Sequence, residues 1–144
     1  MAAQERSSSG TRQPPLVLVV EDEPAIRRIY ALMLTGNGFA TEEAHNGFQA
    51  LEKAIAIRPD LILSDIAVPG LDGIELCRRL RADSRTAGIP ILAVTGHDDR
   101  HYPDRARAAG ANHVLIKPFS VETLVVAARV LLDALGAPRD RSIA

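Results

Sequence analysis

Residues 16–24 read LVLVVEDEP, an apolar and largely β-branched run that ends in three acidic residues and a proline. A continuous apolar run of this length is typical of a strand buried on both faces, as in a parallel sheet. Pro24 suits the first turn of a following helix, because a proline there removes no helical hydrogen bond. The stretch therefore predicts a buried strand that delivers Glu21 and Asp22 to one edge of a sheet.

The rest of the chain alternates between the same two patterns. Further strands are predicted at 61–63, 89–94 and 114–116, and a weaker one at 40–44, which Glu42 and Glu43 mark as an edge strand. Apolar residues recur at helical spacing between the strands: Ile26, Ile29, Tyr30 and Met33; Leu51, Ala54 and Ile55; Ile74, Cys77 and Leu80; a thin stripe around Asp104 to Ala109; and Val121 to Leu135, with Ser120 as N-cap. Five strands alternating with five helices predict an α/β fold with a doubly wound parallel sheet.

Length and composition bound the function. The 144 residues suffice for one domain, and 47% hydrophobic with 24% charged residues is ordinary for a folded protein. The net charge of −1 provides no global basic field, so direct nucleic-acid binding is not expected. The single cysteine excludes an internal disulfide, and no apolar run predicts a signal peptide or membrane insertion. We expect a cytoplasmic protein with a flexible arm at 1–15, one domain at 16–136 and a tail at 137–144.

Polar residues follow each buried run. Glu21 and Asp22 follow the first, Asp65 the second, Thr95 the third and Lys117 the fourth. Each alone has an ordinary explanation, such as a helix cap, a turn residue or a surface charge. Parallel strands end at one edge of the sheet, however, and ligands bind outside those ends. The sequence therefore predicts that the five side chains converge.

Such a cluster has a definite chemistry. Neighbouring carboxylates repel one another unless they hold a proton or a cation, and all-oxygen ligands favour Mg²⁺. A carboxylate beside Mg²⁺ can attack phosphorus to give an aspartyl phosphate. The hydroxyl of Thr95 and the ammonium of Lys117, one of only two lysines in the chain, would then serve the phosphoryl oxygens.

Four motifs arrive in a recognisable order. They are Glu21-Asp22-Glu23-Pro24, Ser64-Asp65 followed by Pro69-Gly70-Leu71-Asp72-Gly73, Val94-Thr95-Gly96, and Ile116-Lys117-Pro118-Phe119. From Leu16 to Leu135 the chain resembles a response-regulator receiver domain of two-component signalling, of the single-domain, chemotaxis-regulator type. The resemblance implies a flavodoxin-like sheet in the order 2-1-3-4-5.

The resemblance also assigns roles. It implies that Asp65 is the phosphoacceptor, that Asp22 is a direct Mg²⁺ ligand, and that Glu21 acts through water. It implies further that the backbone carbonyl of Ala67 completes the protein ligands. Thr95 would be the switch hydroxyl, and Lys117 would pair with Asp65 and precede a cis peptide bond to Pro118.

The implied function is signalling rather than enzymatic turnover. A sensor histidine kinase or a phosphotransfer protein would donate the phosphoryl group to Asp65, and the only chemistry expected is self-phosphorylation and self-dephosphorylation. A downstream protein would bind the face formed by the fourth helix, fifth strand and fifth helix, which could also form a phosphorylation-dependent dimer.

Three positions depart from the family pattern. Val68 stands where Met is usual, Gly96 where Ala is usual, and Val114 where Tyr or Phe is usual. Valine has no ring to swing toward the phosphate. We therefore expect the signal to travel through residues 96–103 and the fourth helix, with Arg100, Tyr102 and Arg105 as candidate reporters.

Three other classes of protein are alternatives to this interpretation. A dinucleotide-binding domain would have a glycine-rich loop after the first strand, where this chain has acidic residues. A haloacid dehalogenase-type phosphatase would have a second Asp where Ala67 stands. A degenerate receiver that binds partners without phosphorylation is the remaining alternative, and beryllofluoride binding would distinguish it.

Overall fold

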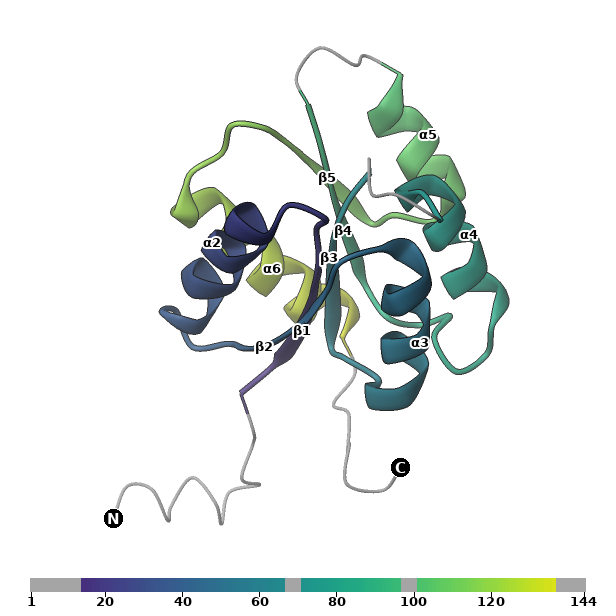
Figure 1. The fold of residues 1–144 in the computed structure, drawn as a ribbon, viewed down its shortest axis with the longest axis horizontal. Helices are drawn as coiled ribbons and strands as arrows, with labels where there is room; N and C mark the ends of the chain where they lie inside the picture. Colours follow the sequence, from purple (N-terminus) through teal and green to yellow (C-terminus); the bar gives the residue numbers. More distant parts are fainter. Residues whose placement is uncertain (1–13, 67–70, 97–100, 137–144) are drawn as a thin grey trace.

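The computed structural model describes residues 14–66, 71–96 and 101–136. Five strands alternate with five helices (Figure 1), as the sequence predicts. The strands are β1 (Leu16–Val20), β2 (Ala40–Ala44), β3 (Leu61–Asp65), β4 (Ile91–Thr95) and β5 (His113–Ile116). The helices are α2 (Pro24–Thr35), α3 (Gly47–Ile57), α4 (Gly73–Ala82), α5 (Tyr102–Ala109) and α6 (Val121–Leu135). The expected arm and tail lie almost wholly outside the described residues.

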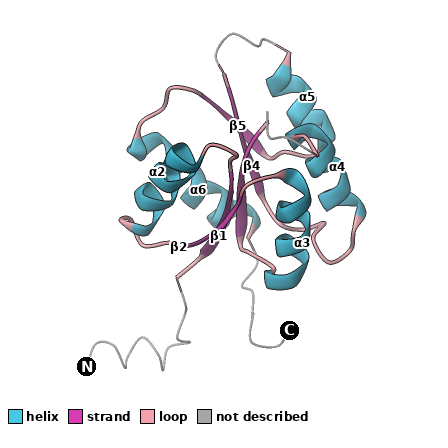
Figure 2. Ribbon diagram, viewed as in Figure 1, coloured by secondary structure: helices cyan, strands magenta, loops and turns pink. Residues whose placement is uncertain are grey.

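The five strands form one parallel sheet in the order β2-β1-β3-β4-β5. This order confirms the flavodoxin-like fold, with the weak strand β2 at one edge. Helices α2 and α6 cover one face of the sheet, and α3, α4 and α5 cover the other (Figures 1 and 2). Because every crossover returns to the same end of the sheet, all five strands finish at one edge.

Alternate residues of β1 enter two separate cores, as the continuous apolar run predicts. Val17 and Val19 pack with α2 and α6, whereas Leu18 and Val20 pack with α3, α4 and α5. All four side chains are at most 1% exposed. Burial on both faces holds the strand rigidly, and thereby fixes where Glu21 begins.

Two sequence-based details are wrong. Strand β4 begins at Ile91 rather than at residue 89, because Thr86 accepts a hydrogen bond from the Ile89 amide and Pro90 has no amide hydrogen to donate. In α2, Ile29 is 49% exposed, and the buried face carries Tyr30, Ala31 and Leu34. In the described part of the chain, no helix is long and apolar enough to cross a membrane.

Candidate functional site

Glu21 follows β1 directly and is held on several sides. Its amide donates to the carbonyl of Ala44 on the neighbouring strand, at 3.1 Å. Its Oε2 accepts from the amide of Glu23 at 3.1 Å, and Glu23 in turn caps α2 by accepting from the Ala25 amide. The residue is only 3% exposed. Its other oxygen, Oε1, is buried without a hydrogen-bond partner among the described residues.

The carboxyl of Asp65, at the end of β3, lies beside Glu21. The pKa of Glu21 is raised to about 7, first because burial disfavours its charge and then because of the neighbouring Asp65 carboxyl. While both groups are ionised neither can donate a hydrogen bond, which explains the orphaned Oε1. A proton or a cation between the two residues would satisfy that oxygen.

Lys117 completes the centre of the cluster from β5. Its Nζ donates to Oδ2 of Asp65 at 2.8 Å, with the Asp65 side chain 9% exposed. Burial alone would lower the pKa of Lys117, but the hydrogen bond and charge of Asp65 outweigh burial and raise it. The Lys117 amide donates to the carbonyl of Thr95 at 2.9 Å, and the Lys117–Pro118 peptide bond is cis, as the resemblance implies.

The remaining predicted residues are placed differently. Thr95 ends β4, is 3% exposed and lies one residue beyond the Val94 that pairs with Asp65. Asp22 is exposed at the start of the β1–α2 turn. Ala67, Val68 and Arg100 lie outside the described residues. Within the described ranges, no three His, Cys, Asp or Glu side chains gather closely enough to form a metal site.

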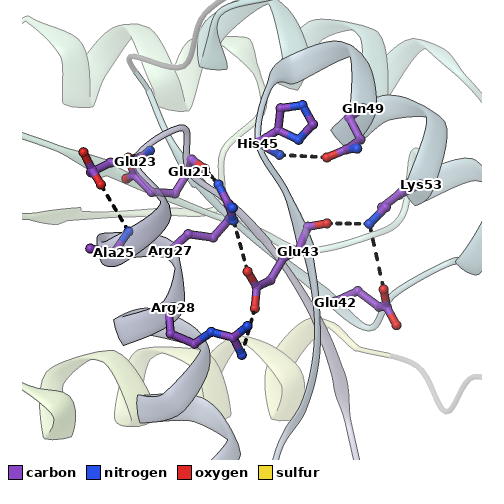
Figure 3. A network of polar contacts seen from close by, with 10 residues as sticks. All are labelled: Glu21, Glu23, Ala25, Arg27, Arg28, Glu42, Glu43, His45, Gln49 and Lys53. Carbon is purple, nitrogen blue, oxygen red and sulfur yellow. Dashed lines mark hydrogen bonds and ion pairs between the residues drawn. The ribbon is translucent and has the colours of Figure 1, made fainter.

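Two groups beside the cluster were not predicted from sequence. Tyr30 of α2 is buried, stacks on Phe119 at 5.6 Å between ring centroids, and has a pKa raised by burial. Arg27 of α2 donates to the Glu21 carbonyl at 2.9 Å and to Oε1 of Glu43 at 3.0 Å (Figure 3). Tyr30 belongs to an apolar stripe, and Arg27 has charged residues nearby in the sequence. The neighbouring sequence therefore does not indicate that either residue lies beside the cluster.

Residues 17–129 match the response regulator receiver domain family. The chain is 36% identical over 118 residues to the DNA-binding dual master transcriptional regulator RpaA of Synechocystis, covering 82% of this chain and 49% of RpaA. It thus spans about half the length of the curated relatives it matches.

Two solved structures extend the comparison. The chemotaxis response regulator CheY4 of Vibrio cholerae is 34% identical, with a TM-score of 0.77 covering 83% of this chain and 99% of that one. The receiver domain of a sensor histidine kinase from Pseudomonas aeruginosa is 31% identical, with a TM-score of 0.75 covering 86% and 99%. That receiver domain has a magnesium ion coordinated in its active site cleft.

The chain belongs to the response regulator receiver domain family. It is a signalling domain of two-component systems rather than an enzyme in the ordinary sense, and its family role is that of a phosphoacceptor. Family membership favours this role over a dinucleotide-binding domain or a phosphatase. The degenerate, phosphorylation-independent alternative is not favoured.

Proposed function

We propose that Asp65 is the residue that accepts the phosphoryl group, from a phosphohistidine on a sensor histidine kinase or a phosphotransfer protein. The observation that carries this proposal is the hydrogen bond from Nζ of Lys117 to Oδ2 of the nearly buried Asp65, at 2.8 Å. Beside this pair lies Glu21, whose Oε1 has no hydrogen-bond partner among the described residues. A nearly buried carboxylate between an ammonium and a second carboxyl is suited to act as a nucleophile in phosphoryl transfer rather than to stabilise the fold.

Glu21 and Asp65 offer the kind of oxygen ligands that suit a magnesium ion. Glu21 Oε1 is a buried oxygen with no partner in the described part of the chain, and Glu21 and Asp65 supply only hard oxygen ligands. Asp22, Asp65 and the Ala67 carbonyl would hold the ion, with Glu21 assisting. When bound, Mg²⁺ would neutralise the carboxylates and the charge on the transferring phosphoryl group.

The chain's own residues account for the remaining steps. An oxygen of Asp65 forms a bond to phosphorus while the phosphorus–nitrogen bond to the donor imidazole breaks, and the electron pair of that bond stays on the imidazole. Lys117 loses Asp65 as an acceptor and moves its hydrogen bond to a phosphoryl oxygen. Thr95 donates its hydroxyl to another. Self-dephosphorylation follows when water attacks the same phosphorus and the Asp65 oxygen leaves.

The proposed output surface is the face formed by α5, β5 and α6. A groove of about 480 Å³ lies along β5 and α6, lined by apolar side chains that include Leu115, Val126 and Val130. Val126 and Val130 are 59% and 57% exposed, and Ile116 is 48% exposed. Exposed apolar area of this kind supports a protein partner or a dimer, and the net charge of −1 argues against direct contact with nucleic acid. A cytoplasmic location belongs to the same proposal.

Labelled phosphoryl transfer from a phosphohistidine donor tests the proposal. Wild-type protein should gain label in the presence of Mg²⁺, and Asp65→Asn should gain none. Lys117→Ala and Thr95→Ala leave Asp65 in place, so both variants should still gain label, but more slowly than the wild type. Label on Asp65→Asn at the wild-type level would refute the assignment.

A further inference from the structure

The backbone around Glu21 is unusually well fixed for a strand end. The Glu21 amide is bound by the Ala44 carbonyl, Oε2 is bound by the Glu23 amide, and the Glu21 carbonyl is bound by Nη1 of Arg27 at 2.9 Å. The carbonyl bond comes from a side chain on the next helix rather than from a strand partner. It fixes the peptide plane between Glu21 and Asp22, and so the position of the Asp22 nitrogen and Cα from which the side chain leaves the backbone.

Arg27 is itself held by a second residue. Its Nε donates to Oε1 of Glu43 on β2 at 3.0 Å, so one guanidinium bridges the β1–α2 turn and the edge strand (Figure 3). The Arg27 and Glu43 side chains are 18% and 26% exposed, which shields the pair partly from water. The Glu43 carbonyl accepts in turn from Nζ of Lys53 on α3, at 2.6 Å. The planar fork of arginine suits this double role, because it donates in two fixed directions at once.

We propose that Arg27, clamped by Glu43, is a positioning residue for divalent metal binding at the acidic turn formed by Glu21 and Asp22. This inference rests on the proposed function, since it concerns the same metal site. Arg27 contacts the Glu21 carbonyl and acts on the metal ligands only through the backbone. Glu43 balances the guanidinium charge, so the turn is fixed without an unbalanced positive charge beside the cation site.

Whether a substitution of Arg27 strengthens or weakens Mg²⁺ binding distinguishes a positioning role from a purely electrostatic effect of the guanidinium charge. Removing a positive charge near a cation site should strengthen Mg²⁺ binding, because repulsion is relieved. Removing a positioning hydrogen bond should weaken Mg²⁺ binding, because the ligands are no longer pre-arranged. Arg27→Gln removes both the charge and the bridge, so the two accounts predict opposite directions.

The neighbouring Arg28 provides a matched control. It lies on the same helix with a side chain 67% exposed, and it approaches Oε2 of Glu43 at 3.6 Å. No hydrogen bond joins it to the Glu21 carbonyl among the described contacts, in which Arg27 is the donor. Arg28→Gln therefore removes the same charge one residue away without removing the bridge.

Magnesium titration of the full chain, followed by the backbone amide NMR shifts of residues 21–23, measures the effect. We expect Arg27→Gln to raise the Mg²⁺ dissociation constant at least fivefold, and Arg28→Gln to change it less than twofold. Arg27→Lys keeps the charge but cannot donate in the same fork, so it should also weaken binding; it replaces Arg27→Gln if that variant does not fold.

Unchanged or tighter Mg²⁺ binding by both Arg27 variants would overturn the positioning role. Equal weakening in Arg27→Gln and Arg28→Gln would also overturn it, because a general effect of the helix would then explain both. These outcomes differ from a failure of the proposed function, which would appear as label on Asp65→Asn whatever the titration shows.

Discussion

The carboxyl of Glu21 makes the stability of the metal-free protein depend on pH. Its pKa is about 7 in the folded chain against 4.5 in the unfolded chain, so the folded state holds this proton more tightly. The associated stability is fully present below pH 4.5 and is lost as the pH rises through 7. At pH 8 the Glu21 carboxyl of the folded protein is ionised and buried beside Asp65, which lowers the free energy of unfolding.

Glu21→Gln should therefore stabilise the metal-free protein at pH 8. The expected gain in the free energy of unfolding is about 1–3 kcal/mol, because the amide needs no ionisation. Near pH 4 the two proteins should be equally stable, since Glu21 is then protonated in both states. Urea unfolding with a chelator at the two pH values measures the difference. A variant that gains nothing at pH 8 would show that Glu21 carries no such cost.

Arg27 shows why part of the site could not be predicted. The buried residues of α2 are Tyr30, Ala31 and Leu34, and the half-buried Arg27 lies one turn earlier on the same helical face. Counting apolar residues places Ile26, Ile29 and Met33 toward the core: Ile26 and Met33 do pack there, partly buried, but Ile29 is exposed. Asp65 and Lys117 could be predicted because they end apolar strands. Arg27 is half-buried and is held by contacts with Glu21 and Glu43, which no local pattern encodes.

Among the elements, α5 is tied to α4 at its C-terminal end by Arg81. Its last turn leads into Gly110, whose carbonyl accepts from Nε and Nη2 of Arg81 at 3.0 and 2.9 Å. Arg81 also donates to Oδ1 of Asn112 at 2.8 Å. At the other end, Tyr102 begins the helix and packs, partly buried, against the core. Within the helix only Ala106 and Ala109 are buried.

The Arg81 contacts predict which part of α5 a phosphorylation signal can move. Val114 lies buried in the same core as Ala106 and Ala109. Because residue 114 is a valine, there is no aromatic ring at this position to relay phosphorylation of Asp65 to α5. Beryllofluoride should alter hydrogen exchange at residues 102–106 and leave residues 110–112, which Arg81 holds, almost unchanged. Exchange measured with and without beryllofluoride, with fluoride alone as control, checks this. Changes confined to the loops around Asp65 and Lys117 would show that α5 is not part of the route.

The strands were predictable to within a few residues, and the helices were predictable in number and order. Apolar runs and helical spacing are local properties, so one sequence suffices to place them. The exact ends of strands depend on single residues: Pro90 has no amide hydrogen to donate, and β4 begins after it, at Ile91.

For the whole molecule, the parallel sheet brings residues 21, 65, 95 and 117 to one edge although they are far apart in the chain. This arrangement concentrates negative charge that the fold alone does not neutralise, since Lys117 supplies one positive charge to Asp65 and Glu21 remains beside it. Of the five side chains expected to converge, Lys117 pairs with Asp65, and Glu21 lies beside Asp65. The exposed Asp22 does not join them in a three-carboxylate cluster within the described residues.

Magnesium should raise the melting temperature of the whole protein. A ligand that binds only the folded state at ten times its dissociation constant adds about 1.4 kcal/mol, which corresponds to roughly 4–6 °C for a domain of this size. Thermal unfolding at pH 8 with Mg²⁺, compared with NaCl at equal ionic strength, measures the shift. An increase no larger than that given by NaCl would argue against a specific site.

Chemical mapping of the phosphorylated residue is the sharpest test of Asp65 as the phosphoacceptor. Borohydride reduces an aspartyl phosphate to homoserine, and peptide mass spectrometry then locates the altered residue. After incubation with a phosphohistidine donor and Mg²⁺, homoserine is expected at position 65, and its formation should require the donor. Homoserine at another aspartate, or none at position 65 while the protein carries label, would contradict the account.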